Sequence, residues 1–261
     1  MSPAEARLAG VIPPEGYVRP PRASFTDAAR TGFAVASLAG QLARVGLRGS
    51  GGPAPASTTA DGLALIRRFC LDQLARVGVR LEVLRAESVP ADGGLVFMWN
   101  QASHLDHLVV PPAMPRPFHS IYNNAVHRTP LYGKYMARQG HFWVDRTDEA
   151  QWRAQIAIVA ERVRQGACVL VSPEGTRSWD GRLLPMKRGA FLLARQASRP
   201  IVCVTVVGAH DRLPRGGVAV RPGPVRVVFG DPLPVSSGDP TLEAQVIATF
   251  DRLLEQHRLH D

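Results

Sequence analysis

Short apolar runs alternate with amphipathic stretches along most of this chain, and that alternation is the feature that most constrains its fold. Runs typical of strands cover 95–99, 118–122, 142–144, 168–171, 201–207 and 225–229. Helical patterns flank or separate them at 60–77, 104–110, 130–138, 148–165, 190–196 and 240–257. Strands connected through helices form a sheet that is covered on both faces. The sequence therefore predicts an α/β fold with a mainly parallel central sheet flanked by helices.

The amino-terminal region differs in composition from the rest of the chain. A loose arm precedes an apolar helical pattern at 26–45, and a Gly-, Pro- and Ser-rich stretch follows at 46–59. Together with the helix at 60–77, this predicts an amino-terminal helical pair. We divide the chain into residues 1–58 and an α/β domain at 59–261. The uncharged run 31–43 is shorter than the roughly 20 apolar residues that span a bilayer, so this helix either lies in a membrane interface or packs on the protein.

The net charge indicates which partners the protein can bind, and the cysteines indicate the redox environment in which it works. The formal net charge is +9, and Lys134 and Lys187 are the only lysines, so arginine supplies most of the positive charge. A basic surface suits phosphorylated substrates or anionic lipid, and the scattered basic residues disfavour nucleic acid. Cys70, Cys168 and Cys203 lie apart in apolar sequence, which indicates reduced thiols. We expect a cytoplasmic protein that is peripheral on the cytoplasmic face of the membrane.

A polar segment, residues 99–107, directly follows the apolar run at 95–99. It contains Gln101, His104, Asp106 and His107 within one turn. Ligands usually bind at the carboxyl edge of an α/β sheet, where such a segment lies. The alternative is an ordinary strand-to-helix turn in which a polar side chain caps the next helix. The stretch is the first candidate for a functional site.

Basic side chains follow two further predicted strands. The segment 172–177, which ends in Arg177, follows the run at 168–171, and Arg146 follows the run at 142–144. Lys187 stands about ten residues after Arg177, just before a predicted helix. Guanidinium groups and helix amino termini both favour anions. We therefore expect these residues to share an anionic ligand, although each alone is also compatible with a surface ion pair.

Four sequence blocks and their order resemble those of a known family, the glycerolipid acyltransferases, which include the lysophosphatidic acid and glycerol-3-phosphate acyltransferases. The blocks are residues 100–106, 140–146, 173–177 and 200–204. The segment 184–191 also resembles the family's segment after the third block. The resemblance extends from about Leu95 to Pro234, and its most specific part is the Glu-Gly-Thr-Arg sequence of the third block.

The resemblance implies acyl transfer from acyl-CoA or acyl-carrier protein to a hydroxyl of a phosphate-bearing glycerolipid precursor, such as lysophosphatidic acid. It implies no metal or redox cofactor. A His five residues before an Asp is the family's general base, and the Asp orients it. Transferred to this sequence, the Asp is Asp106. The residues implied to hold the acceptor's phosphate are Arg146, Glu174, Gly175, Thr176 and Arg177, to which our own interpretation adds Lys187.

The position five residues before Asp106 holds Gln101 instead of His. An amide cannot accept a proton as a base. In the hypothesis that we favour, His104 is the base, Asp106 orients it, and Gln101 binds substrate or positions His104. In a second hypothesis the protein is a non-catalytic relative that binds lipid or acyl groups. In a third, Gln101 is an engineered change that traps a complex.

A more remote alternative is a metal-dependent hydrolase. His104, Asp106 and His107 resemble half of the zinc site of metallo-β-lactamase-like enzymes, because two imidazoles and a carboxylate could bind Zn²⁺. The first His of that pattern would fall at Ala102. The Glu-Gly-Thr-Arg block also has no role in such a site. We therefore predict a site without metal.

Overall fold

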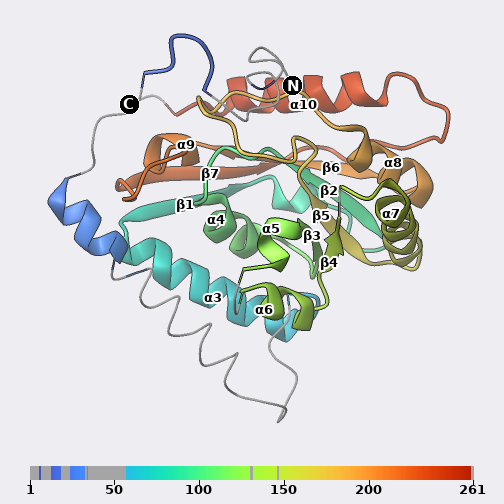
Figure 1. Cartoon of the computed structure of the whole chain (residues 1–261), viewed down its shortest axis with the longest axis horizontal. Coiled ribbons are helices and arrows are strands. Elements are labelled where there is room, and N and C mark those ends of the chain that lie inside the picture. Colours follow the sequence, from blue (N-terminus) through green and yellow to red (C-terminus); the bar gives the residue numbers. More distant parts are fainter. Residues whose placement is uncertain are drawn as a thin grey trace.

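A computed structural model of the 261-residue chain describes residues 6, 13–18, 24–32, 34, 57–129, 132–145 and 147–259. One seven-stranded sheet with the order β1-β7-β6-β2-β5-β3-β4 forms its centre (Figure 1). The strands are β1 (Val79–Leu84), β2 (Leu95–Trp99), β3 (His119–Asn123), β4 (Phe142–Val144), β5 (Cys168–Val171), β6 (Ile201–Val207) and β7 (Gly223–Phe229). The helices are α3 (Ala60–Arg76), α4 (Asp106–Ala113), α5 (Asn124–His127), α6 (Tyr132–Arg138), α7 (Glu149–Arg164), α8 (Arg188–Ala197), α9 (Ala209–Arg212) and α10 (Leu242–Gln256), with a short 3-10 turn at Ala86–Ser88.

Most strand pairs are parallel, which confirms the predicted fold class. Strands β2, β3, β4, β5 and β6 run in one direction. β7 is antiparallel to β6, and β1 is parallel to β7. The carboxyl ends of β2 and its neighbours β5 and β6 therefore meet at one edge of the sheet, so the loops that follow these three strands lie close together.

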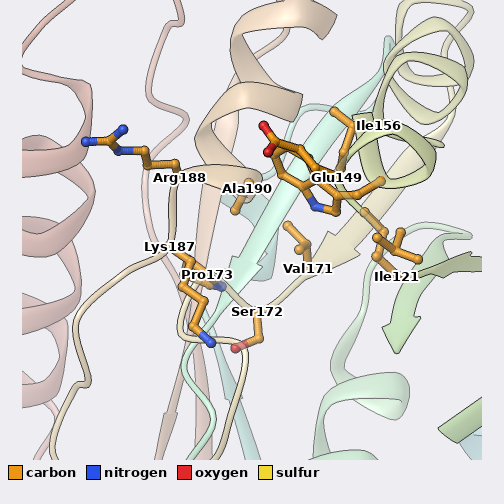
Figure 2. A pocket seen from close by; sticks show the side chains of 12 residues that line it. Ile121, Glu149, Ile156, Val171, Ser172, Pro173, Lys187, Arg188 and Ala190 are labelled. Atoms are coloured by element: carbon orange, nitrogen blue, oxygen red, sulfur yellow. The ribbon is translucent and has the colours of Figure 1, made fainter. Parts of the chain in front are cut away.

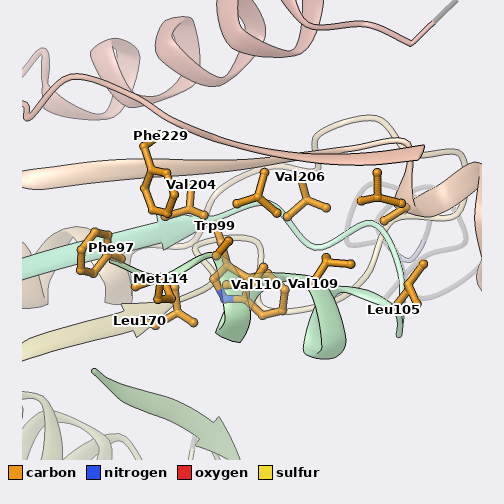
Figure 3. Packing of buried hydrophobic residues seen from close by; sticks show 14 of the residues in the cluster. Phe97, Trp99, Leu105, Val109, Val110, Met114, Leu170, Val204, Val206 and Phe229 are labelled. Atoms are coloured by element: carbon orange, nitrogen blue, oxygen red, sulfur yellow. The ribbon is translucent and has the colours of Figure 1, made fainter. Parts of the chain in front are cut away.

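Side chains of the central strands alternate between two hydrophobic cores, one on each face of the sheet. In β2, Phe97 and Trp99 pack in the core beneath α3 and α4, and Val96 and Met98 pack against α7, α8 and α10. Figure 3 shows the first core, in which α4 lies against Trp99 and neighbouring strands. Both faces of β2 are buried, as its uninterrupted apolar sequence predicts.

Most predicted elements coincide with observed ones, and the clearest correction concerns α4. We predicted a helix at 104–110, which ends before Pro111, but the observed helix continues through Pro111 and Pro112 to Ala113. The amide of Met114 still donates to the carbonyl of Val110, which closes the last turn. The two prolines remove two hydrogen-bond donors near the end of the helix, and the Met114 amide supplies the bond that holds its last turn.

Strand β1 was not predicted, because its sequence does not identify it as a buried strand. Its side chains are mostly half-buried or exposed, and charged Arg80 and Glu82 interrupt the apolar positions. Glu82 pairs instead with Arg226 on β7, with a nitrogen–oxygen distance of 2.7 Å. The hydrophobicity of residues 79–84 alone cannot predict this contact between neighbouring strands.

Helical residues 25–32 and 34, the amino-terminal helix, pack on the α/β domain. Ser24 and Asp27 cap its start through reciprocal hydrogen bonds. Thr31 accepts a hydrogen bond of 2.8 Å from the amide of Val220, and Ala34 is part of the core beside α3 and α4. The described half of the predicted 26–45 helix is therefore attached to the protein, and 35–45 lies outside the described residues. No helix among the described residues is long and apolar enough to cross a membrane.

The ends of β2 and β6 are joined by one buried side chain, Asn100, which is 2% exposed. Its amide donates to the carbonyl of Val206 at 3.1 Å, and its oxygen accepts from the amide of Val206 at 2.7 Å. An asparagine is suited to this bridge because it carries a donor and an acceptor on one group.

The Asn100→Ala substitution is expected to lower the free energy of unfolding by about 3 kcal/mol, because it leaves two buried backbone groups of Val206 unpaired. Urea unfolding measures the change. The matched control is Thr205→Val, since the hydroxyl of Thr205 is buried without a hydrogen-bond partner among the described residues. We expect the control to be neutral or stabilising, and equal losses in both variants would contradict the bridge.

Candidate active site

The loop after β2 turns around the carboxylate of Asp106, the first residue of α4. One oxygen, Oδ2, accepts hydrogen bonds from the amides of Ala102 at 2.9 Å and Ser103 at 2.8 Å. The hydroxyl of Ser103 accepts from the amide of Leu105 and donates to the carbonyl of Leu213. The second oxygen of Asp106, Oδ1, is buried and has no hydrogen-bond partner among the described residues. Oδ1 of Asp106 is therefore available to a further hydrogen bond beneath the loop.

Burial controls the charge of Asp106. Desolvation raises its pKa to about 8, although the amides of Ser103 and Ala102 and the charge of Arg177 act in the opposite direction. The buried carboxyl of Glu174 adds to the increase. At neutral pH the free site therefore favours a protonated Asp106, and a cation formed beside it would favour the ionised carboxylate.

His104 lies on the same loop but makes no hydrogen bond to Asp106. Its ring is exposed, and partial desolvation together with the positive charges of Arg177 and Arg215 lowers its pKa. The imidazole is therefore mostly neutral at pH 7 and able to accept a proton. The start of α4 directs the Asp106 carboxylate inward under the loop, so His104 has no carboxylate partner in the described part of the chain.

Gln101 contacts the third block through its backbone. Its amide donates to Oε1 of Glu174 at 2.7 Å, and its carbonyl accepts from the amide of Ser178 at 2.9 Å. The other oxygen of Glu174 accepts from the amide of Leu184 at 2.7 Å. Glu174 is 2% exposed, and burial raises its pKa to about 7. Its carboxyl therefore connects three segments of the site.

Gly175 and Thr176 form the turn that separates Glu174 from Arg177. Gly175 has a φ of 68°, a left-handed conformation that glycine adopts without strain. Thr176 is half-buried in the same turn. This turn directs the Glu174 carboxyl inward and leaves the half-buried Arg177 close enough to Asp106 and His104 to affect the pKa of both. Arg177 makes no ion pair with any carboxylate of the described residues.

A cavity of about 370 Å³ opens beside this site, between β5, α7 and the start of α8. Figure 2 shows Ile121, Ile156, Val171 and Ala190 around it, and Lys187 beside Pro173. Lys187 and Arg188 contribute positive charge to this largely apolar lining. The amide of Lys187 donates to the carbonyl of Pro173, which fixes the start of α8 beside the end of β5.

The predicted site residues thus fall into three groups. The first group lies at the ends of β2 and β5 and contains Gln101, His104, Asp106, Glu174, Gly175, Thr176 and Arg177. Lys187 lines the adjacent cavity. The predicted ligand Arg146 lies outside the described residues.

Sequence reasoning missed one cation, Arg215, which follows β6 in the loop after α9. Its guanidinium carbon lies 4.3 Å from the ring centre of Trp179, and its Nη1 donates to the carbonyl of Arg177 at 2.7 Å. No motif marks this residue. Its position after the carboxyl end of β6 is the one available signal, because β6 neighbours β2 in the sheet.

The residues proposed for the metal-dependent hydrolase, His104, Asp106 and His107, do not form a metal-binding group in the structure. His107 packs edge-on against Trp99, with ring centres 5.6 Å apart, and lies 6.5 Å from the ring of His104. Oδ2 of Asp106 is already bound by two amides. Within the described residues, no three His, Cys, Asp or Glu side chains form a group that could hold a metal ion.

The fold and the site together define an α/β protein with a polar, cationic site at the carboxyl edge of its sheet. A model of the family described as "Acyltransferase" matches residues 80–207, which contain the loops after β2 and β5. This segment of the chain is therefore similar to the acyltransferase family.

Curated proteins with acyltransferase names are also similar to part of the chain. The chain is 30% identical over 139 residues to a 1-acyl-sn-glycerol-3-phosphate acyltransferase of Cocos nucifera, which covers 53% of this chain and 45% of the relative. It is 34% identical over 142 residues to the Limnanthes douglasii enzyme of that name, covering 53% and 50%. It is 30% identical over 152 residues to the human alpha enzyme, covering 58% and 54%. The chain spans about half the length of the curated relatives it matches.

A solved structure shows the same fold over most of the chain. It is described as that of the 1-acyl-sn-glycerophosphate acyltransferase PlsC from Thermotoga maritima, and it matches with a TM-score of 0.72. The match covers 90% of this chain and 97% of the other at 19% identity. The similarity therefore extends beyond the segment matched by the family model.

The Asp106→Asn substitution is expected to change how stability depends on pH. The folded carboxyl keeps its proton up to a pKa of about 8, whereas an unfolded Asp ionises near pH 4. Ionisation of the unfolded chain therefore lowers wild-type stability as pH rises from 4 to 8, by at most about 1.4 kcal/mol per pH unit. Asn lacks this ionisation, so the variant gains stability relative to wild type over that range. Urea unfolding at several pH values measures the difference, and a constant difference would contradict the raised pKa.

Proposed function

We propose that this protein transfers an acyl group from acyl-CoA or acyl-carrier protein to a hydroxyl of a phosphate-bearing glycerolipid precursor. The observation that best supports this is the convergence of Gln101, His104, Asp106 and Arg177 on one loop cluster beside a largely apolar cavity. The names of the curated relatives support the same reaction and acceptor class. The reaction requires no metal or redox cofactor.

The two halves of the site suit the two chemical parts of such substrates. Arg177, which has no ion pair with a described carboxylate, is available to a phosphate group through paired hydrogen bonds. The cavity beneath α7 and α8 offers apolar surface to an acyl chain, and Lys187 and Arg188 offer charge at its lining. In this arrangement Gly175 and Thr176 shape the turn, and Glu174 holds it.

The proposed chemistry is a single acyl transfer. His104, kept neutral by its lowered pKa, accepts the proton of the acceptor hydroxyl. The hydroxyl oxygen attacks the carbonyl carbon of the thioester, the carbon–sulfur bond breaks, and the leaving thiolate takes the proton from the imidazolium. Because the carboxylate of Asp106 lies buried under the same loop, the positive charge that develops on His104 favours the ionised form of Asp106.

A second candidate function is binding of lipid or acyl groups without turnover. Gln101 occupies the position at which the family has its base, and His104 has no hydrogen-bonded carboxylate among the described residues. Such a protein would retain phosphate and acyl-chain recognition but lack a competent proton acceptor. The two candidates differ in whether any transfer occurs.

Acyl transfer assays with the Gln101→His and His104→Ala variants distinguish them. We expect the wild type to acylate glycerol 3-phosphate or lysophosphatidic acid, and His104→Ala to lose about 100-fold or more of that activity, the usual contribution of a general base. His257→Ala, at the end of α10, is the matched control and should retain activity. Turnover in Gln101→His alone would reject His104 as the base and favour the binding function. No transfer by any of the four proteins would reject acyl transfer to these acceptors.

We also propose that the protein binds the surface of anionic membranes, where its lipid substrates reside. Three large apolar side chains are almost fully exposed: Val18 is 84% exposed, Phe25 89% and Val218 89%. Such side chains near basic residues are typical of peripheral membrane attachment. The net charge of +9 favours anionic lipid.

Contacts connect the segments that carry these side chains. Tyr17, which precedes Val18, packs edge-on against Trp179 with ring centres 5.8 Å apart. Trp179 in turn packs against Arg215 in the loop that contains Val218. The same loop reaches the amino-terminal helix of Phe25 through the Thr31–Val220 hydrogen bond. The proposed membrane surface therefore lies at the side of the cationic site.

The double substitution Phe25→Ser and Val218→Ser is expected to reduce binding to phosphatidylglycerol vesicles by about tenfold or more, because each buried apolar side chain contributes about 1.5 kcal/mol or more. Co-sedimentation measures the bound fraction. Ile158→Ser is the control, since Ile158 is 51% exposed on α7. If the control weakens binding as much as the double variant does, the proposed membrane surface is wrong.

A further inference from the structure

The loop after β6 brings a second arginine, Arg215, to the site that contains Arg177. Ser103, beneath the loop after β2, donates to the carbonyl of Leu213 at 2.7 Å, which attaches the two loops to each other. Two residues later, Arg215 lies against the face of Trp179 and donates one N–H to the carbonyl of Arg177. Its side chain is therefore fixed at both its flat face and one edge, which reduces the entropy that it would lose on binding a ligand.

Arg177, Arg215 and His104 influence one another electrostatically. The charges of both arginines act on His104, and the charge of Arg215 acts on Arg177. Both guanidinium groups are half-buried. Two partly desolvated cations that act on each other favour the binding of an anion that pairs with both. Arg177 makes no ion pair with a described carboxylate, and the nearby Asp106 is directed inward to the amides of its own loop.

We propose that Arg215 is a substrate-binding residue that acts with Arg177 on the acceptor's phosphate and makes the site selective for a phosphate monoester. This inference rests on the proposed function and adds a residue from outside the four blocks of the family. Two guanidinium groups suit a monoester, which carries two negative charges near neutral pH and three unsubstituted oxygens. A phosphodiester carries one charge and two such oxygens, so it gains less from the second arginine.

The position of this cation pair also suits the reaction. In glycerol 3-phosphate, the central hydroxyl is separated from the phosphate ester oxygen by only two carbon atoms. A phosphate held by Arg177 and Arg215 therefore keeps that hydroxyl within the neighbourhood of His104, whose pKa both arginines lower. Binding of the phosphate dianion compensates their charge and makes His104 a stronger base when the acceptor is present.

Binding measurements test this without requiring turnover. Isothermal titration of the full chain with glycerol 3-phosphate, and separately with the diester sn-glycero-3-phosphocholine, gives the affinity for each. We expect wild type to prefer the monoester. Arg215→Gln should weaken glycerol 3-phosphate binding by about tenfold or more, the effect of losing one charge-assisted hydrogen bond, and should change diester binding much less. Arg215→Lys, which keeps a cation over Trp179, should fall between wild type and Arg215→Gln.

The matched control is Arg182→Gln, because Arg182 lies only five residues after Arg177 but its side chain is 88% exposed. NMR titration of His104 supplies a second readout. Its pKa should rise when glycerol 3-phosphate binds, and in the free protein it should be higher in Arg215→Gln than in wild type or Arg182→Gln. A merely structural role for Arg215 would leave the monoester preference unchanged.

The outcomes separate this inference from the proposed function. Equal loss of monoester and diester affinity in Arg215→Gln, or no loss in either, would overturn the role of Arg215 while acyl transfer stands. Wild type that binds glycerol 3-phosphate but shows no preference over the diester would also overturn it. Absence of both glycerol 3-phosphate binding and acyl transfer in wild type would reject the proposed function itself.

Discussion

The buried carboxyl of Glu174 is the interaction on which the arrangement of the site depends. Its two oxygens accept hydrogen bonds from the amides of Gln101 and Leu184, which belong to segments far apart in the sequence. The loop after β2 carries Gln101, His104 and Asp106, and the loop after β5 carries Arg177. A shorter or apolar side chain at position 174 would leave two amides without their acceptor and would allow these loops to separate. Placing a carboxyl group here costs desolvation free energy, which its raised pKa reflects.

This role for Glu174 differs from the one that the family resemblance implied. A buried acidic side chain beside a phosphate would repel it, whereas one that accepts two backbone hydrogen bonds can position the residues that bind it. Arg177 and Arg215 are the groups suited to direct contact. The distribution of charge is therefore layered: carboxyl groups lie beneath the loops, and cations lie at their surface.

The predictable part of this structure was the part encoded by local pattern. The bounds of β2, β4, β5 and β6 follow directly from short apolar runs, and Asp148 caps α7 through its hydrogen bond to Gln151. The half-buried strand β1 has no such pattern, because its charged side chain Glu82 is stabilised by Arg226 on a neighbouring strand. Arg215 was missed for a related reason: it reaches the site because β6 neighbours β2 in the sheet, and local sequence pattern does not encode the order of the strands. Motif order predicted that the loops after β2 and β5 lie together, but not which side chains contact one another.

Gln101 is held in the site by two hydrogen bonds of its main-chain atoms: its amide donates to Glu174, and its carbonyl accepts from Ser178. Substitution of the side chain therefore leaves the framework of the site in place, and the open oxygen of Asp106 remains beneath it. Glutamine and histidine codons differ only in their last base. A single nucleotide change is thus enough to exchange an amide for an imidazole here with little cost to folding, so the chemistry at this position can evolve in either direction independently of the stability of the domain.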